Sequence, residues 1–360
     1  MVAFGHTCSF AVILYGSYDP CGNFVWYSLA QRPTVRPSTR VRDRRVRLEM
    51  NTRANTDERI GSTDMRYYQL REEGTPRLAV QTTDGLYDLT AAKPQLRTLE
   101  DLFTAATIAD SSLDRVAERL LDGAAVLSPD VLDADGDGDD GAVSAPISSG
   151  EVWAAGVTYR ISEEARKAES SMEDMYIDVY DSERPEVFFK ATPSRTVGPD
   201  ERVGIRADSE WDVPEPELGV VLSDGEIVGY TIGNDMSSRS IEGRNPLYLP
   251  QAKVYDRCCS IGPCVRSADS VDDPHDLEMW MTISRDGEVL YDDSTNTGKM
   301  VRSVEELVDC YTSHNAVPEV SVLLTGTSLV PDDDFTLREG DLIEIGVEDI
   351  GTLSNTVVEV

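Results

Sequence analysis

The sequence predicts an α+β protein in which a β-rich mixed roll or barrel follows a small α+β domain. From Glu151 onward, short apolar segments with the alternation typical of strands dominate the chain. Turns rich in Gly, Asp and Pro separate them, which favours a roll or barrel over a doubly wound sheet. A longer stretch with helical spacing lies earlier, within residues 65–127, and indicates the smaller domain.

The first 64 residues differ from the rest of the chain. They contain nine Arg, no Lys and six acidic residues, for a charge of +3, and show no clear helical or strand period. We expect residues 1–64 to be a disordered extension or a read-through upstream of a true start at Met65. A basic anchoring arm is the alternative, because Arg40–Arg47 form a basic cluster.

Residues 65–127 are expected to form the small α+β domain. Met65 begins a pattern of strand, turn and strand, and Thr98–Leu121 has the apolar spacing of a helix with a broken apolar face. These two patterns together predict a short sheet covered by helical structure.

The next segment, residues 128–150, is predicted to be an acidic linker because it is rich in Asp, Gly, Ser and Pro. Asp133, Asp135 and Asp137 resemble the beginning of an EF-hand loop. Position twelve of such a loop would be Ser144 rather than Glu, so we interpret the segment as solvated rather than calcium-binding.

Residues 151–360 are predicted to be the β-rich catalytic domain, with one helix at Val304–Cys310. Its strand-like segments are Val187–Ala191, Val203–Arg206, Glu217–Leu222, Ile227–Ile232, Glu278–Ser284, Ser321–Thr325 and Leu342–Val347.

The composition is acidic and poor in lysine. The 360 residues carry a formal charge of −33, with five Lys against 28 Arg. Such a surface on a chain with 40% hydrophobic residues suggests a cytoplasmic protein of a high-salt organism, and it excludes an acidic disordered protein. Nucleic acid is not an expected partner, because no basic stripe exists beyond the first 64 residues.

The six cysteines form no C-x-x-C pair, and we expect buried, reduced thiols. The apolar stretch Ser9–Tyr15 is too short to span a bilayer and lacks a basic segment before it. No membrane association is therefore predicted.

The segment Trp211–Arg239 carries the strongest signal for a site. Asp224–Gly225 between two apolar runs predicts a β-hairpin. A two-residue loop would place Glu215 opposite Asn234, whereas a three-residue loop would place it opposite Asp235. Because alternate residues of a strand share a face, Glu217 is expected to lie beside Glu215 in either register.

Three clustered carboxylates repel one another and favour a bound cation. Ligation by oxygen alone indicates a hard ion, Mg²⁺ first and Mn²⁺ or Ca²⁺ as alternatives. In so acidic a chain, three surface acids without a ligand are the competing explanation. The position of these acids at the boundaries of apolar runs favours Glu215, Glu217 and Asp235 as metal ligands.

Residues 65–360 resemble the fumarylacetoacetate hydrolase superfamily, most clearly over residues 151–262. The order and spacing of several short segments carry this resemblance, and the IEGRNPLYLPQAK segment makes the chain most similar to the 2-keto-3-deoxy-pentonate dehydratases. The other segments are AGVTY, RPEVFFKATPS, PEPELG, GYTIGNDMSSR, LPQAKVYDRCCSIGP, LLTGT, LREGDLIEI and GTLSN.

The resemblance implies a fumarylacetoacetase C-terminal type of fold, Mg²⁺ on the three acids, and dehydration of a 2-keto-3-deoxy-arabinonate or -xylonate to 2,5-dioxopentanoate. It also implies a homo-oligomer, a dimer or tetramer. Lys253 and Glu186 are then the expected catalytic residues. The residues expected to bind substrate are Lys190, Thr325, Thr327, Ser237 and Arg239.

Two lysines retained in a chain that has lost most others support this assignment, since an amine can bind a carboxylate or move a proton. For Lys190 a structural salt bridge is the alternative.

The chain departs from the hydrolases of the superfamily at Ser162, where they have a histidine that handles water. This favours dehydration over an acylpyruvate hydrolase or oxaloacetate decarboxylase activity. The run 162–170 is predicted to be a helical lid. A metal-binding regulator without catalytic activity is the alternative from another class, and it gives no reason for the two lysines.

Overall fold

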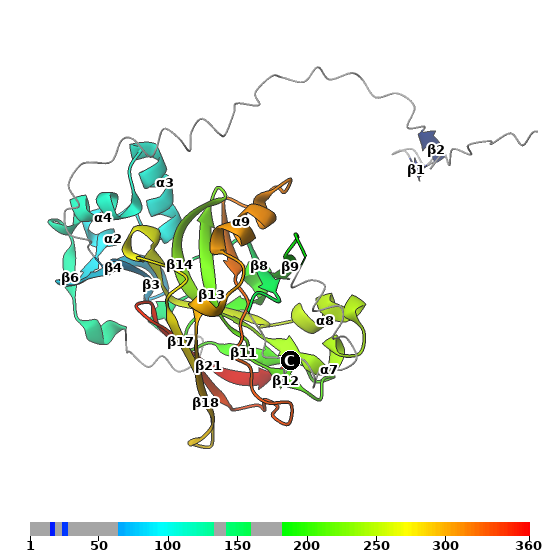
Figure 1. Ribbon diagram of the computed structural model, residues 1–360. Helices are drawn as coiled ribbons and strands as arrows, with labels where there is room; N and C mark the ends of the chain where they lie inside the picture. The colour runs from blue at the N-terminus through cyan, green and yellow to red at the C-terminus, as the bar shows by residue number, and fades with distance from the viewer. Residues whose placement is uncertain (1–14, 19–23, 28–63, 133–141, 160–181) are drawn as a thin grey trace, which may run out of the picture. The chain divides into compact units, whose positions relative to one another are not determined.

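The computed structural model describes residues 15–18, 24–27, 64–132, 142–159 and 182–360 (Figure 1). Contacts divide the chain into two compact units, residues 1–60 and 61–360. In the first unit the structure describes two antiparallel strands, β1 (Tyr15–Tyr18) and β2 (Phe24–Tyr27). The rest of the expected N-terminal extension lies outside the described residues, so the extension and the start at Met65 stay predictions.

A twelve-stranded sheet forms the main layer of the second unit. Its path runs β6-β5-β4-β3-β16-β14-β13-β19-β8-β9, with β10 beside β16 and β7 beside β3. Most pairs are antiparallel, but β19–β8 and β10–β16 are parallel. The strands are β3 (Arg66–Glu72), β4 (Thr75–Thr82), β5 (Gly85–Asp88), β6 (Ala125–Leu127), β7 (Val143–Ser144), β8 (Glu151–Gly156), β9 (Glu186–Ala191), β10 (Thr196–Val197), β13 (Pro216–Ser223), β14 (Glu226–Asp235), β16 (Cys259–Ser267) and β19 (Val320–Leu324).

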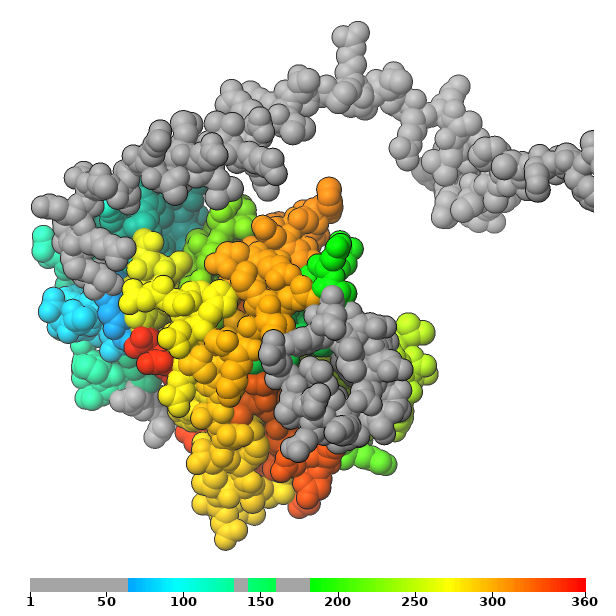
Figure 2. Space-filling model, viewed as in Figure 1, coloured from blue at the N-terminus to red at the C-terminus, as the bar shows by residue number. Residues whose placement is uncertain are grey.

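A five-stranded sheet, ordered β11-β21-β20-β17-β18, forms the second layer, and β12 pairs with β15 separately. Figure 2 shows the β17–β18 hairpin projecting from the surface, where Val289 and Leu290 are exposed. The strands are β11 (Arg202–Ile205), β12 (Asp212–Val213), β15 (Ser237–Ser238), β17 (Glu278–Arg285), β18 (Glu288–Asn296), β20 (Leu342–Val347) and β21 (Gly351–Glu359).

The helices are short. The expected helical stretch at residues 98–121 is two helices, because Asp110 adopts a left-handed conformation and Ser112 begins a new helix as its N-cap. Among described residues no helix has the length and apolar character needed to cross a membrane. The helices are α2 (Leu89–Ala92), α3 (Leu99–Ala109), α4 (Leu113–Leu121), α7 (Arg239–Glu242), α8 (Leu249–Lys253) and α9 (Val304–Thr312), with short 3₁₀ turns at Pro129–Val131, Pro193–Arg195, Pro246–Tyr248, Ala268–Ser270 and Thr297–Lys299.

The N-terminal strands join the same sheet as the catalytic strands. Strand β3 pairs with β16, with Tyr67 opposite Val265, and both side chains are fully buried. The contacts give residues 61–360 as one unit. They do not test the predicted domain boundaries at residues 127 and 150, which stay predictions. The EF-hand-like acids at 133–137 lie outside the described residues.

All seven predicted strands are present, with ends shifted by at most a few residues. Of the strands in residues 151–360, the sequence did not predict β8, β10, β12, β15, β16, β18 and β21. Gly262–Pro263 interrupts the apolar pattern of β16, and β18 is an edge strand whose residues are mostly exposed. An edge strand without a buried face lacks the alternation that identifies strands in a sequence.

Candidate active site

The β13–β14 hairpin brings the three predicted acids together. Its loop has two residues, with Ser223 opposite Glu226, but a bulge between Val221 and Leu222 shifts the register by one. The Asp235 amide consequently donates to the Glu215 carbonyl at 2.9 Å. The loop therefore has two residues, the shorter of the two predicted lengths. Glu215 nevertheless pairs with Asp235, as predicted for the three-residue loop, because the bulge supplies the extra residue.

All three acids point to one face and are buried. Glu217 lies opposite Gly233, next to the pairing of Glu215 with Asp235. One oxygen from each carboxylate lies within 4.8 Å of the others. Buried carboxylate oxygens at this spacing fit a hard divalent cation such as Mg²⁺, with Mn²⁺ and Ca²⁺ compatible with the same donors.

Glycines create room beneath this acidic cluster, defined as Glu215, Glu217 and Asp235. A Cβ atom at Gly233 would lie 2.3 Å from Leu324 Cδ2. The absence of a side chain at Gly233, opposite Glu217, leaves the space that Leu324 fills.

Lys253, the last residue of α8, reaches into the cluster. Its Nζ donates to Glu215 Oε2 at 2.5 Å, to Asp235 Oδ2 at 3.0 Å and to Ser237 Oγ at 2.6 Å. Its Nζ also lies 5.5 Å from the centroid of the Phe188 ring. Burial by itself would lower the pKa of Lys253, but the charges of Asp235 and Glu215 outweigh it and raise the pKa. The amine is therefore held as an ammonium ion.

Lys190 lies at the opposite side of Asp235. Its Nζ is 2.5 Å from Asp235 Oδ1, and it donates to the carbonyls of Met236 at 2.8 Å and Lys253 at 2.5 Å. The side chain is fully buried. The two carbonyls take two of the three N–H groups of the ammonium, and the ion pair with Asp235 is the third contact. Lys190 thus joins the end of β14 to the end of α8.

Arg239 forms an ion pair with the second carboxylate oxygen of Glu215. Its Nη2 lies 2.9 Å from Glu215 Oε1, and its Nη1 lies 3.8 Å from Glu242 Oε2. Lys253 and Arg239 together lower the pKa of Glu215 although burial opposes them. The Arg239 side chain is 25% exposed.

Among the described residues no ion pair joins Glu217 to a cation. Gly326 donates its amide to Glu217 Oε2 at 2.6 Å. Burial, followed by the charges of Asp235 and Glu215, raises the pKa of Glu217 well above its usual range. The cluster is thus short of positive charge at Glu217.

Glu186 begins β9 opposite Gly156. Its carboxylate occupies the space of the missing side chain, since a Cβ at Gly156 would lie 2.2 Å from Glu186 Oε2. Burial and the charge of Glu242 raise the pKa of Glu186, while Lys253 opposes the shift. Among the described residues no hydrogen bond or ion pair engages this carboxylate, so it is available for proton transfer.

The described residues near the site carry an excess of two negative charges. Five acids (Glu186, Glu215, Glu217, Asp235 and Glu242) face three cations (Lys190, Lys253 and Arg239) when all are ionised. The expectation that the acids need a cation is therefore refined, because the lysines and the arginine neutralise part of the charge. One divalent ion would neutralise the rest.

The predicted threonines differ in their contacts. Thr325 is buried, donates to the Leu218 carbonyl at 3.0 Å, and accepts from Thr158 at its own carbonyl at 2.6 Å. Its hydroxyl proton is thus used within the protein. Thr327 accepts from the Leu329 amide at 3.0 Å and keeps its own proton for another acceptor. Thr327 therefore fits the predicted contact with substrate better than Thr325.

The structure brings Lys190, Lys253, Glu186, Ser237 and Arg239 around the acidic cluster, as the sequence predicted. It adds Glu242 and the Gly326 amide, which the sequence did not single out. Glu242 lies in the IEGRNPLYLPQAK segment, which carries the resemblance to the dehydratases, so that resemblance could have identified it as a candidate site residue. Ser162 and the predicted lid at 162–170 lie outside the described residues.

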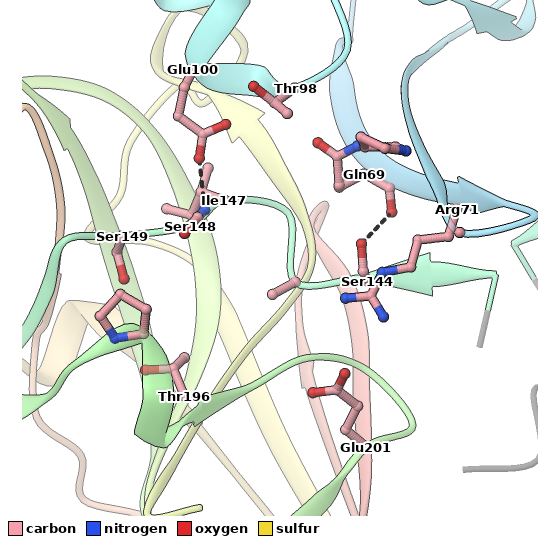
Figure 3. A pocket seen from close by; sticks show the side chains of 14 residues that line it. Gln69, Arg71, Thr98, Glu100, Ser144, Ile147, Ser148, Ser149, Thr196 and Glu201 are labelled. Carbon is pink, nitrogen blue, oxygen red and sulfur yellow. Dashed lines mark hydrogen bonds between the residues drawn. The ribbon is translucent and has the colours of Figure 1, made fainter. Parts of the chain in front are cut away.

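A separate pocket of about 430 Å³ lies between β3, the N-terminus of α3 and the segment 144–149 (Figure 3). Its walls are polar and apolar in similar measure, and Glu100 accepts the Ser148 amide at 2.6 Å. None of the predicted site residues lines this pocket. The candidate chemistry is confined to the open end of the β13–β14 hairpin.

Comparisons with known proteins agree with this geometry. A family model described as fumarylacetoacetate (FAA) hydrolase C-terminal matches residues 151–358. The chain is 61% identical over 296 residues to a probable 2-keto-3-deoxyxylonate dehydratase of Haloferax volcanii, covering 82% of this chain and all of the relative. It is 44% identical over 220 residues to a 2-dehydro-3-deoxy-D-arabinonate dehydratase of Saccharolobus solfataricus, covering 60% of this chain and 74% of the relative.

A solved structure is also similar. It is a 2-keto-3-deoxy-D-arabinonate dehydratase complexed with magnesium and 2,5-dioxopentanoate, with a TM-score of 0.70 and 33% identity. The match covers 82% of this chain and 99% of that chain.

Proposed function

This chain belongs to the fumarylacetoacetate hydrolase family, and from that premise we propose that it is a magnesium-dependent dehydratase of 2-keto-3-deoxy-pentonates. The products are 2,5-dioxopentanoate and water. The observation that carries the proposal is the buried acidic cluster with two lysines against it, in a chain similar to a dehydratase complexed with magnesium and this product.

Glu215, Glu217 and Asp235 are the residues that would hold the metal. When bound, Mg²⁺ polarises the keto group of a 2-keto acid and thereby acidifies the protons at C3. Lys253, Lys190 and Arg239 hold two of the three carboxylates in place, which limits the reorganisation needed on binding.

The protein's residues move the protons. Glu186, whose carboxylate is not engaged, takes the proton from C3. The C3–H electron pair forms the C3=C4 bond, the C4–O bond breaks, and the departing hydroxyl takes a proton and leaves as water. Lys253, held as an ammonium ion, is the donor. Two proton transfers then give the C5 aldehyde: a proton leaves C5 while one is added at C3, and the proton of the C5 hydroxyl leaves while one is added at C4.

Substrate contacts are proposed for two side chains of the predicted set. Arg239 and Thr327 are proposed to bind substrate oxygens, and Ser237 holds Lys253 in position through its 2.6 Å hydrogen bond. Lys190 and Thr325 use their donors within the protein, so we assign them positioning roles in place of direct substrate contact.

Dehydration is favoured over hydrolysis of an acylpyruvate or decarboxylation of oxaloacetate. Of the described histidines, neither His275 nor His314 has a contact with the acidic cluster, and His275 Nε2 accepts the Val304 amide at 2.9 Å. Dehydration needs no activated water. A regulator that only binds metal would not require Lys253, because chelation by carboxylates gains nothing from a cation between them.

The cellular location, the pathway and the oligomeric state are proposed from composition and similarity. We place the enzyme in the cytoplasm of a high-salt organism, in pentose degradation, and expect a homo-oligomer. The lysine-poor composition and the free thiols of Cys258, Cys259, Cys264 and Cys310 support a reducing, salty interior.

A substrate screen tests the function. The full chain in concentrated KCl with Mg²⁺ is incubated with 2-keto-3-deoxyxylonate, 2-keto-3-deoxyarabinonate and acetylpyruvate, and the products are identified by NMR. We expect 2,5-dioxopentanoate from one or both sugar acids and no cleavage of acetylpyruvate. Cleavage of acetylpyruvate without dehydration would instead establish the hydrolase.

A further inference from the structure

The pocket of about 430 Å³ beside β3 and the N-terminus of α3 takes no part in the proposed reaction. Its volume lies within the roughly 300–1,000 Å³ of sites that hold small molecules. Figure 3 shows Arg71 and Glu201 on one side of the pocket and Glu100, Ser148 and Ser149 on the other. The cavity is therefore large enough for a small ligand, and charged groups lie on two sides of it.

Ser149, in the wall of this pocket, has a buried hydroxyl without a partner. The residue is 2% exposed, and its Oγ makes no hydrogen bond with any described residue. Buried hydroxyls are normally paired, because an unpaired one loses its hydrogen bonds to water without replacement. A ligand in the pocket would supply the missing partner.

Arg71 contributes a cation that the fold does not use. Its backbone amide donates to the Ala142 carbonyl at 2.8 Å, which holds this end of β3 in place. Among the described residues no hydrogen bond or ion pair engages its guanidinium, and the residue is exposed. The five N–H donors of the guanidinium therefore remain for a ligand.

The two carboxylates of the pocket are held in place with one oxygen each. Glu100 Oε1 accepts the Ser148 amide at 2.6 Å, and Glu201 Oε2 accepts the Gly198 amide at 2.7 Å. The second oxygen of each carboxylate has no partner within the part of the chain that the structure describes. Both side chains are therefore oriented and still able to accept hydrogen bonds.

These donors and acceptors together select a class of ligand. An anion would bind Arg71 but would be repelled by two carboxylates, and an amine would bind the carboxylates but leave the guanidinium without an acceptor. Hydroxyl groups both donate and accept, so a neutral polyhydroxylated molecule satisfies Arg71, Ser149 and both glutamates. The apolar part of the wall, which includes Pro76, Ile147 and Pro193, suits the C–H groups of the same molecule.

We propose that this pocket is a binding site for a small neutral sugar or polyol, separate from the active site. Arg71 donates to oxygens of the ligand, Glu100 and Glu201 accept from its hydroxyls, and Ser149 pairs with one of them. None of the residues assigned to the proposed reaction lines the pocket, so the site does not depend on that reaction.

Titration with D-xylose, a neutral five-carbon sugar, tests the site. The melting temperature of the full chain in concentrated KCl should rise and saturate, because a ligand that binds the folded state stabilises it. Arg71→Gln should raise the half-saturating concentration by at least about 10-fold, and Ser149→Ala by about 3- to 10-fold. Without sugar, Ser149→Ala should be as stable as wild type or more stable.

Two control variants should bind D-xylose as wild type does. Arg115→Gln changes an exposed arginine of α4 that lies outside the pocket. Glu217→Gln changes the acidic cluster, so sugar binding preserved in this variant would separate the pocket from the active site.

The outcomes that overturn the proposal are distinct. A rise that is linear in sugar concentration and equal in Arg71→Gln is exclusion of sugar from the protein surface, and it refutes a binding site. Saturation by D-xylonate or by the amine N-methylglucamine, but not by D-xylose, refutes the ligand class. Sugar binding lost in Glu217→Gln and kept in Arg71→Gln refutes a site separate from the active site. Dehydratase activity enters none of these measurements, so the failure of this proposal and the failure of the proposed function are distinguishable.

Discussion

Carboxylates are buried in two regions of this protein and are satisfied differently. Asp114, in α4, accepts from the hydroxyls of Tyr67 at 2.8 Å, Ser267 at 2.6 Å and Ser270 at 3.3 Å. The acidic cluster of β13 and β14 is held by cations, and Glu217 has one backbone amide as its donor. Asp114 is thus surrounded by neutral hydroxyl donors. In the acidic cluster the carboxylate oxygens instead lie close to one another.

The difference teaches how to separate a structural carboxylate from a functional one. Hydroxyls that saturate Asp114 connect α4 to β3 and β16, which stabilises the fold and leaves no capacity for a ligand. In the acidic cluster, like charges meet within 4.8 Å, which is unfavourable until a cation binds. Burial is common to both regions, so the donors and not the burial distinguish them.

The largest expected effect is from Glu217→Gln. We expect turnover to fall by at least about 10³-fold, because the metal site loses a ligand and its charge. Stability without Mg²⁺ should be equal or higher, since the repulsion from Asp235 and Glu215 is relieved. The rise of Tm on adding Mg²⁺ should disappear. Glu226→Gln, the same change at the exposed end of the same hairpin, should behave as wild type. A Mg²⁺ response preserved in Glu217→Gln would contradict the ligand assignment.

The intermediate effect is from Asp114→Ala. Three hydroxyls would lose their acceptor, which should lower the free energy of unfolding by about 2–4 kcal/mol. The variant that remains folded should retain wild-type kcat and Mg²⁺ response. Denaturant unfolding and steady-state kinetics measure the two quantities. A loss of kcat in the folded protein would show that the two regions are coupled.

The smallest effect is from Asp212→Asn, a third buried acid. Burial raises the pKa of Asp212 to about 6. The folded state therefore retains a proton that the unfolded state loses near pH 4, and this contribution to stability disappears as the pH rises through about 6.

The loss of stability between pH 5 and pH 8 should consequently be smaller in Asp212→Asn, by about 0.5–1 kcal/mol after allowing for screening. Denaturant melts at both pH values measure it. An identical pH dependence in wild type and variant would show that Asp212 has an ordinary pKa when folded.

Local patterns predicted much of the site. The Asp224–Gly225 turn identified the hairpin, and alternation identified the shared face of Glu215 and Glu217. The pairing of Glu215 with Asp235 was one of two alternatives, because a bulge inside a strand depends on its neighbours and leaves no mark in the sequence. Lys190 and Thr325 were placed at the site, but the use of their donors by backbone carbonyls depends on segments distant in the chain.

The sequence by itself determined seven strands of residues 151–360, the hairpin and the identity of the acids and lysines, because turn chemistry and strand alternation act over a few residues. Only the tertiary structure decided which hydrogen-bond donors are used within the protein. Among the described residues Glu186 has no hydrogen bond or ion pair, whereas the donors of Lys190 and Thr325 are taken by carbonyls 46 to 107 positions away in the chain.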